Sequence, residues 1–335
     1  MKRLTVLLLV LFFVLPNVTL LFAGGSGQQT ASNKVFRMSD NAPDDYPTNI
    51  GNLAFAKYIS ERTNGALKIE LFTNAVLGSE REVVEMAQTG SVHFVRMTTS
   101  MLAAINPLMN ALGMPFLYRD RNHMFKVMDG PIGQEMLESL QRQNLLGLCW
   151  YDAGFRNFYN SKREIKTPAD MQGLKIRMPE SALMMDMVRF LGASPTPMAY
   201  GEVYTGIQNG VVDGAENNWP SYITAGHYEV AKYFTVDQHI AAPEMILVNI
   251  NVWNSFTEAE KKIIREAASE AAKVQRAAWI EAEKKYETQA RTAGCIISDL
   301  TPAQHQLFVA ALEPLYQQSA YVQYADLIKR IREVQ

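Results

Sequence analysis

The 335-residue sequence contains only two cysteines and five histidines, and its positive and negative charges nearly cancel. Lys and Arg number 32 and Asp and Glu number 34, so neither a basic surface for nucleic acid nor a large acidic field is expected. The histidines are scattered without metal-ligand spacing, and no Cys-x-x-Cys pair, nucleophile elbow or glycine-rich phosphate loop is present. These absences disfavour a metalloenzyme and a hydride-transfer enzyme, and no metal or cofactor is expected.

The two cysteines, Cys149 and Cys295, each lie in a short apolar run that is typical of a buried strand. This setting favours two free buried thiols, with a single disulfide as the alternative.

A long apolar run occurs only at the N-terminus. Lys2 and Arg3 precede it, and small residues follow it, which is the pattern of a secretory signal peptide over residues 1–23 with cleavage near Ala23. An uncleaved anchor is the alternative, because the 19 residues from 4 to 22 could just span a bilayer. No later stretch approaches 18 apolar residues, so the mature chain is expected to be soluble outside the cytoplasmic membrane.

The remaining chain alternates short apolar runs with amphipathic segments, which predicts an α/β fold with mostly parallel sheets. Strands are predicted at residues 34–38, 67–72, 92–97, 145–151, 174–177, 211–215 and 245–252. Helices are predicted at residues 49–63, 79–88, 130–143, 181–191 and 200–209. Ligand sites in such folds lie at the C-terminal ends of the strands.

Three helix starts are well defined, because Thr167, Thr257 and Thr301 each stand three residues before an acidic or amide side chain. The helix after Thr257 has no Gly or Pro until Gly294. At about 1.5 Å per residue, a helix over residues 258–292 would be roughly 52 Å long and could brace two domains.

A break of this helix near Trp279 into two shorter helices is the alternative. The boundary between domains is expected where strands cross between lobes, at residues 151–156 and 239–243.

Three arginines are placed near the ends of predicted strands. Arg177 ends an apolar strand just before a helix N-terminus, where its guanidinium and the helix amides could bind an organic anion. Pairing of Arg177 with an internal carboxylate is the alternative. Arg156 follows the strand at 145–151 through Gly154, and Arg96 lies inside an apolar segment. The three predict one shared anion pocket, although Arg96 could instead snorkel from an edge strand.

Polar and aromatic side chains follow the predicted strand at 211–215. Asn217 and Asn218 can donate and accept hydrogen bonds toward hydroxyl groups, and Trp219 could cover the apolar face of a sugar. The alternative for the asparagines is an ordinary helix cap. Tyr200 is expected to line the same pocket, whereas Glu202 could simply stabilise a helix start.

At these residues the sequence resembles the extracytoplasmic solute-binding proteins of TRAP transporters, the DctP family. The matching motifs include Gly154-Phe155-Arg156-Asn157-Phe158, residues 167–177, 192–198 and 202–210, and Val212-Asp213-Gly214-Ala215-Glu216-Asn217. Their order and spacing hold over nearly the whole mature chain.

The resemblance implies a two-lobed α/β periplasmic binding protein fold with crossing hinge strands and a long helix that spans the lobes. Lobe I would comprise residues 34–154 and 243–282, and lobe II residues 155–242 and 283–335, with the ligand cleft between them. Arg177 matches the carboxylate-clamping arginine of the family, and Arg156 and Asn217 match positions that commonly face the ligand.

By the same alignment, Asn41, Glu80 and Thr98 line the cleft in the first lobe, and Glu244 offers a further partner for hydroxyl groups. Relatives that bind sialic acid carry Glu where Thr98 stands, which puts that ligand in doubt here. The run at 215–221, together with 227–233 and Pro243-Glu244, resembles members that are associated with uronates.

The implied function is not enzymatic. A monomeric periplasmic protein would capture a small organic acid, such as a uronate, by lobe closure and deliver it to a TRAP membrane permease. The alternatives are a ligand-sensing partner of a signalling receptor and an exported enzyme that acts on sugar acids.

Overall fold

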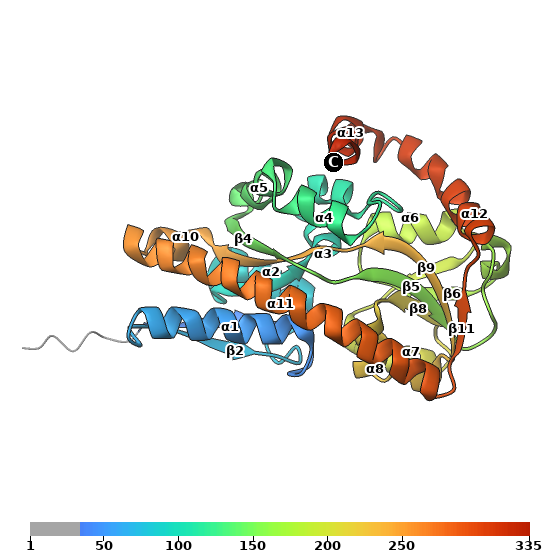
Figure 1. Cartoon of the computed structure of the whole chain (residues 1–335), viewed down its shortest axis with the longest axis horizontal. Helices are drawn as coiled ribbons and strands as arrows, with labels where there is room; N and C mark the ends of the chain where they lie inside the picture. The colour runs from blue at the N-terminus through green and yellow to red at the C-terminus, as the bar shows by residue number, and fades with distance from the viewer. Residues whose placement is uncertain (1–33) are drawn as a thin grey trace, which may run out of the picture. The chain divides into compact units, whose positions relative to one another are not determined.

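The computed structural model describes residues 34–335, which form two mixed β-sheets with helices packed around them (Figure 1). The first sheet, in the order β2-β1-β3-β10-β4, contains β1 (Lys34–Ser39), β2 (Leu67–Phe72), β3 (Phe94–Thr98), β4 (Leu145–Tyr151) and β10 (Glu244–Asn249). The second, in the order β11-β9-β5-β8-β6-β7, contains β5 (Phe155–Asn160), β6 (Lys175–Met178), β7 (Ser194–Pro197), β8 (Gly214–Asn217), β9 (Tyr233–Ala241) and β11 (Ile296–Asp299). The signal peptide predicted for residues 1–23 lies outside the described residues.

Helices follow most of the strands. The longer ones are α1 (Pro47–Arg62), α2 (Glu80–Thr89), α4 (Arg121–Met128), α5 (Pro131–Glu138), α6 (Ala182–Phe190), α11 (Glu258–Thr292), α12 (Pro302–Leu312) and α13 (Ala325–Glu333). The shorter ones are α3 (Thr99–Leu102), α7 (Val203–Gln208), α8 (Trp219–Thr224), α9 (His227–Val230) and α10 (Ile250–Asn254), with 3-10 turns that include η1 (Pro107–Gly113) and η4 (Tyr200–Glu202).

The sheets are mixed: among the described strands, five of the nine pairings are parallel, as predicted, and four are antiparallel. β10 runs antiparallel to both β3 and β4, and β5 runs antiparallel to both β8 and β9. The reason lies in the two places where the chain crosses between sheets. It leaves the first sheet from β4 to β5 and returns from β9 to β10, so each outgoing strand lies beside a returning strand of opposite direction. These crossings fall at the two predicted segments, residues 151–156 and 239–243.

Several strand bounds differ from the predicted ones because tight turns take up apolar residues. Val211 and Val212 donate their backbone N–H groups to the Gly206 carbonyl and close the turn after α7, so β8 begins only at Gly214. The strand predicted at 245–252 ends at Asn249, whose side chain accepts hydrogen bonds from the first N–H groups of α10. The helix predicted at 130–143 ends at Glu138 as α5 and is followed by a short 3-10 turn.

The long helix α11 is continuous over 35 residues, so the alternative of a break near Trp279 is wrong. Its N-terminal capping box at Thr257 is present, as are the predicted boxes at Thr167 and Thr301. The first half of α11 packs on α1, and its C-terminal part packs on α8. Between them, the side chain of Gln275 bonds both the N–H and the carbonyl of Asp152 in the crossing segment, at 2.8 and 2.7 Å.

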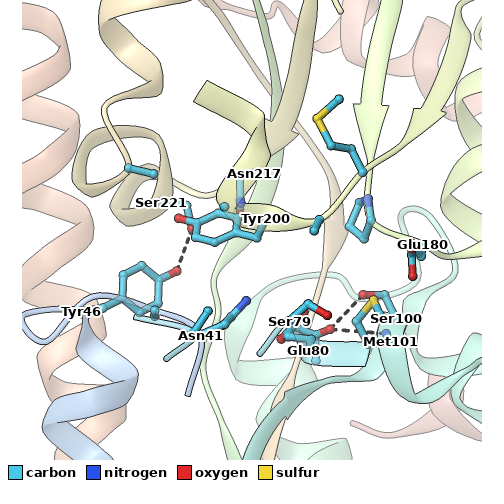
Figure 2. A pocket seen from close by; sticks show the side chains of 18 of the residues that line it. Asn41, Tyr46, Ser79, Glu80, Ser100, Met101, Glu180, Tyr200, Asn217 and Ser221 are labelled. Atoms are coloured by element: carbon cyan, nitrogen blue, oxygen red, sulfur yellow. Dashed lines mark hydrogen bonds between the residues drawn. The ribbon is translucent and has the colours of Figure 1, made fainter. Parts of the chain in front are cut away.

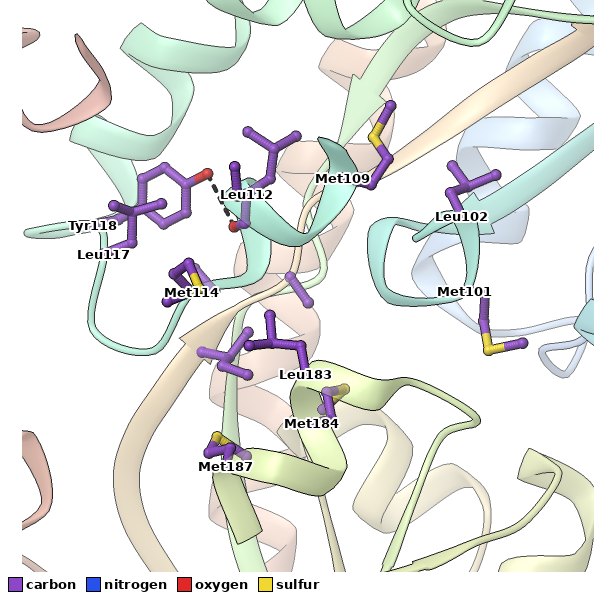
Figure 3. Close-up of a cluster of buried hydrophobic side chains, with 14 of the residues drawn as sticks. Met101, Leu102, Met109, Leu112, Met114, Leu117, Tyr118, Leu183, Met184 and Met187 are labelled. Carbon is purple, nitrogen blue, oxygen red and sulfur yellow. Dashed lines mark hydrogen bonds between the residues drawn. The ribbon is translucent and has the colours of Figure 1, made fainter. Parts of the chain in front are cut away.

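A large apolar cluster joins the helices of the two sheets (Figure 3). Met109, Leu112 and Met114, in and beside η1, belong to the same cluster as Leu183 and Met187 of α6. This packing keeps the two sheets in apolar contact on one side of the crossing strands.

The C-terminal helix α13 lies against α4 and α5. The Nε2 atom of His123 is 3.0 Å from the Ile331 carbonyl oxygen, and Arg330 donates to Glu135 at 2.7 Å. The last residues of the chain therefore pack on helices that precede β4.

Both cysteines are free thiols, as predicted. Cys149 is buried in β4, and burial raises the pKa of its thiol to about 12, whereas Cys295 is only partly buried. Burial therefore keeps the Cys149 thiol protonated and unreactive.

Candidate ligand-binding cleft

A cavity of about 490 Å³ lies between the two sheets and is lined by residues of both. Ten of the residues singled out from the sequence line it, whereas Trp219 does not: Asn41, Glu80, Arg96, Thr98, Arg156, Arg177, Tyr200, Asn217, Asn218 and Glu244. They come from the ends of β1, β3, β6 and β8, the start of α2, the turn η4 and the two crossing segments. The fold thus brings the candidate residues together, while their part in ligand binding stays a prediction.

Arg177 supplies a positive charge that the protein does not neutralise. It is 3% exposed, and its Nε and Nη2 atoms both donate to the Met198 carbonyl, at 2.9 and 2.6 Å. Within residues 34–335, no carboxylate lies within 4 Å of its guanidinium, so the alternative of an internal ion pair is wrong. Burial lowers the pKa of Arg177 from 12.5, yet an arginine stays charged at neutral pH.

His227 lines the cavity on the same side and does not add charge. Burial is the main cause, and the charge of Arg177 the second, that lowers the pKa of this imidazole to about 3. Its Nδ1 atom is 2.7 Å from the Tyr159 hydroxyl. His227 is therefore neutral, and in the sequence it stood out only as part of the run at 227–233, without a role of its own.

Arg156 is paired within the protein. Its guanidinium forms a two-pronged contact with the Glu216 carboxylate, with Nη2 2.7 Å from Oε1, and the same Nη2 donates to the Glu216 carbonyl at 3.0 Å. Burial opposes the charge of Arg156, but Glu216 outweighs it and raises the pKa of the guanidinium. On the other side of Glu216 stands His239, whose pKa rises to about 9 because the attraction of Asp237 and Glu216 outweighs burial.

Arg96 lies deep in the first sheet, on the strand between β1 and β10, and is 4% exposed. Its guanidinium contacts the carboxylates of Asp40, Glu80 and Glu244, and it also donates to the Asn41 side chain. The alternative that Arg96 snorkels from an edge strand is therefore wrong. Its carboxylate partners make this end of the cavity acidic.

The two asparagines after β8 have different roles. Asn218 is the N-cap of α8, where its Oδ1 accepts from the Ser221 N–H at 2.8 Å, so the helix-cap alternative is correct for this residue. Asn217 accepts from the Asn218 N–H through Oδ1 at 2.9 Å, which leaves its amide nitrogen to face the cavity. Thr98 similarly caps α3 by accepting from the Met101 N–H at 3.4 Å.

The aromatic side chains near β8 divide between the cavity and the core. Tyr200 lines the cavity, and burial raises the pKa of its phenol. Trp219, which the sequence predicts as a cover for a sugar face, instead stacks on Phe234 in the core, with ring centroids 3.9 Å apart. The Trp219 prediction is wrong because this residue is the first of α8 and its side chain points into the second sheet's apolar cluster.

Two contacts join the sides of the cavity directly. The Tyr46 hydroxyl lies 2.9 Å from the Ser221 hydroxyl and donates to Asn218 Oδ1 at 3.2 Å (Figure 2). At the other side of the opening, Arg81 of α2 donates to Glu180 at 3.0 Å. Neither pair had a sequence signal, because each joins residues separated by about a hundred positions or more.

Within residues 34–335, no group of three or more His, Cys, Asp or Glu side chains is arranged to hold a metal ion. In the same part of the chain, no helix combines the length and the apolar composition that crossing a membrane would require.

Comparison with known proteins agrees with this architecture. The bacterial extracellular solute-binding protein family 7, named DctP, matches residues 38–323. A solute-binding protein of Chromohalobacter salexigens is 36% identical over 295 residues, which cover 88% of this chain and 87% of that relative.

Two crystal structures extend the likeness to three dimensions. A TRAP periplasmic solute-binding protein of Roseobacter denitrificans with bound β-D-glucuronate is 33% identical, with a TM-score of 0.87 over 90% of this chain and 100% of that one. Another from a Bradyrhizobium species, in complex with α/β-D-galacturonate, is 38% identical, with a TM-score of 0.86 over the same shares. The two sheets, the crossing strands and the long helix are thus those of two-lobed TRAP binding proteins, and the chain belongs to the DctP family of bacterial extracellular solute-binding proteins.

Proposed function

We propose that this protein captures a uronate, such as glucuronate or galacturonate, and delivers it to a TRAP membrane permease. The observation that carries the proposal is Arg177, a buried guanidinium that faces the cavity and has no carboxylate partner among residues 34–335. A buried charge is costly unless it is paired, and a carboxylate matches the planar fork of an arginine. The ligand's carboxylate is therefore assigned to Arg177.

The rest of the cavity suits a hydroxylated ring. Asn41 and Asn217 offer amide groups, Tyr200 offers a hydroxyl group, and Glu80 and Glu244 offer acceptors. The volume lies in the range of small-molecule sites. The glucuronate and galacturonate held by the two solved relatives support the same class of ligand.

Capture is proposed to proceed by closure of two lobes that divide at residues 154/155 and 242/243 and near residue 282 within α11. The contacts of α13 with α4 and α5 support placing residues 325–333 with the first lobe. A ligand favours closure only by its greater affinity for the closed form. The permease would then recognise the closed monomer in the periplasm, after cleavage of the signal peptide.

Titration calorimetry on the mature protein, refolded to remove carried-over ligand, tests the proposal. Glucuronate or galacturonate is expected to bind, and Arg177→Ala is expected to weaken the Kd by at least about 30-fold, since losing one partner of a buried charge pair costs about 2–5 kcal/mol. Lys175→Ala is the matched control, because Lys175 is an exposed cation on the same strand.

Three outcomes would contradict parts of the proposal. If no sugar acid binds, the proposed function is wrong. If Arg177→Ala binds as tightly as the wild type, the carboxylate lies elsewhere. If mass spectrometry finds the ligand chemically changed after incubation, the protein is an exported enzyme.

A further inference from the structure

The end of the cavity formed by the first sheet holds more negative than positive charge. The Nη1 atom of Arg96 lies 3.1 Å from Glu80 and 3.3 Å from Glu244, and its Nη2 atom contacts Asp40. Within residues 34–335, no second cation lies within 4 Å of these carboxylates. One guanidinium thus faces three carboxylates, an excess of two negative charges if all three are ionised.

The three carboxylates are not equivalent. Asp40 is held by the protein, because its oxygens accept from the Ala42 N–H, the Thr48 hydroxyl and the Asn52 amide at 2.8–2.9 Å. Glu80 and Glu244, in contrast, line the cavity. Asp40 therefore has a structural role, while the two glutamates are available to a ligand.

Glu244 has an unused oxygen. The residue is 5% exposed, and its Oε2 atom is buried without a hydrogen-bond partner in the described part of the chain. A buried polar atom that lacks a partner is destabilising, and this one belongs to a side chain that lines the cavity. The missing partner is therefore expected to come from the ligand.

The protonation states of Glu80 and Glu244 are suited to hydrogen bonding with a hydroxyl group. Burial raises the pKa of Glu244 to about 8 against the opposing charge of Arg96, and burial also raises the pKa of Glu80. A carboxyl group near its pKa can donate or accept a hydrogen bond, and a sugar hydroxyl can do both in return. Even with one proton retained, the cluster of Arg96, Asp40, Glu80 and Glu244 keeps one net negative charge.

We propose that Glu80 and Glu244 form a subsite for the hydroxyl groups at the ligand end remote from its carboxylate, and that this subsite rejects diacids. The inference rests on the proposed function, since Arg177 must hold the first carboxylate. A second carboxylate would enter a buried region that is already negative, where like charges oppose binding. The protein thus selects monocarboxylic sugar acids over the corresponding dicarboxylic ones.

Gluconate and glucarate are the decisive probes, because they share the same carbon chain and differ only in a terminal alcohol or carboxylate. Calorimetry at pH 7.5 is expected to give glucarate a Kd at least about tenfold weaker than those of gluconate and glucuronate. The double variant Glu80→Gln/Glu244→Gln keeps the side-chain shapes and removes the negative charge. The ratio of the glucarate Kd to the gluconate Kd is therefore expected to fall to about threefold or less. Glu85→Gln, at an exposed position of α2, is the control and should keep the wild-type ratio.

The inference is overturned if glucarate binds the wild type as tightly as gluconate, or if the ratio survives in the double variant. Where neither open-chain acid binds the wild type, the double variant must gain glucarate binding. If circular dichroism shows the double variant unfolded, Glu244→Gln is compared with the wild type at pH 9, where a smaller ratio is expected. Failure of the proposed function is distinct, because the wild type would then bind neither glucuronate nor galacturonate.

Discussion

Tyr46→Phe removes one oxygen atom from the contact that joins the two sides of the cavity. The hydroxyl of Tyr46 lies 2.9 Å from Ser221 and 3.2 Å from Asn218 across the cavity. The ring itself packs edge-on against Trp279, with centroids 5.6 Å apart, and the residue is 4% exposed. Phenylalanine keeps this packing, so the change isolates the two hydrogen bonds.

The magnitude follows from the number of bonds lost. Each neutral hydrogen bond contributes about 0.5–1.5 kcal/mol net, so the pair should contribute roughly 1–3 kcal/mol to the closed form. If the open form lacks these contacts, ligand affinity is expected to fall by about 5- to 160-fold. The loss should appear in the dissociation rate, because closure follows the first encounter with the ligand.

Stopped-flow fluorescence with glucuronate would separate the two rates, and calorimetry would give the Kd. Tyr58→Phe is the control, because its hydroxyl donates to Glu266 at 3.2 Å and the residue does not line the cavity. A Tyr46→Phe protein with an unchanged dissociation rate would refute the reasoning that this contact stabilises closure. If Tyr46→Phe slowed only the association rate, the Tyr46 hydroxyl would act in the open form and not in the closed one.

Two further predictions concern stability. Gly51→Ala should lower the free energy of unfolding by about 1–3 kcal/mol, because the added Cβ would lie 2.6 Å from the Gln275 Cβ where α1 crosses α11. Urea titration measures this loss. The control is Ile50→Ala, which should show no such loss because Ile50 is 41% exposed. The pKa of His239 rises from 6.5 to about 9, so its contribution to stability is present below pH 6.5 and lost as the pH rises through 9. His239→Gln should therefore reduce the decline in unfolding free energy between pH 6.5 and 9.5 by an amount on the order of 3 kcal/mol. Equal declines in the wild type and the variant would contradict the conclusion that Asp237 and Glu216 keep His239 charged.

The strands that sequence periodicity identifies are those with apolar buried positions. β1, β2 and β4 have the predicted starts because their inward residues are apolar. β5 and β9 were not predicted, because their buried positions include Arg156, Asn157, Asp237 and His239. Hydrophobic periodicity identifies a strand only when its buried residues are apolar. It therefore misses strands whose buried side chains form a charged network beside a cavity. β7, which contains two prolines, is an edge strand and gives no such signal.

The candidate residues could be located from motifs, but their partners could not. Arg156 meets Glu216 because β5 pairs with β8, a register that joins residues 60 positions apart. Arg177 stands between Thr196 and Ala215 in its sheet, so neither neighbouring strand offers it a carboxylate. The difference between a paired and an unpaired arginine therefore depends on strand order, which local sequence does not determine.

The difference between Arg156 and Arg177 also explains how a chain with a net charge of −2 can select an anion. Arg156 is neutralised by Glu216, while Arg177 has no carboxylate partner in the described part of the chain, so the second sheet presents one positive charge to the cavity. On the first sheet Arg96 is outnumbered by its carboxylates, so the opposite side is negative. A ligand with one carboxylate and a hydroxylated far end satisfies both sides in only one orientation. A ligand that pairs with Arg177 alone leaves the Glu244 oxygen without a partner, and closure over it should be less favourable for that reason.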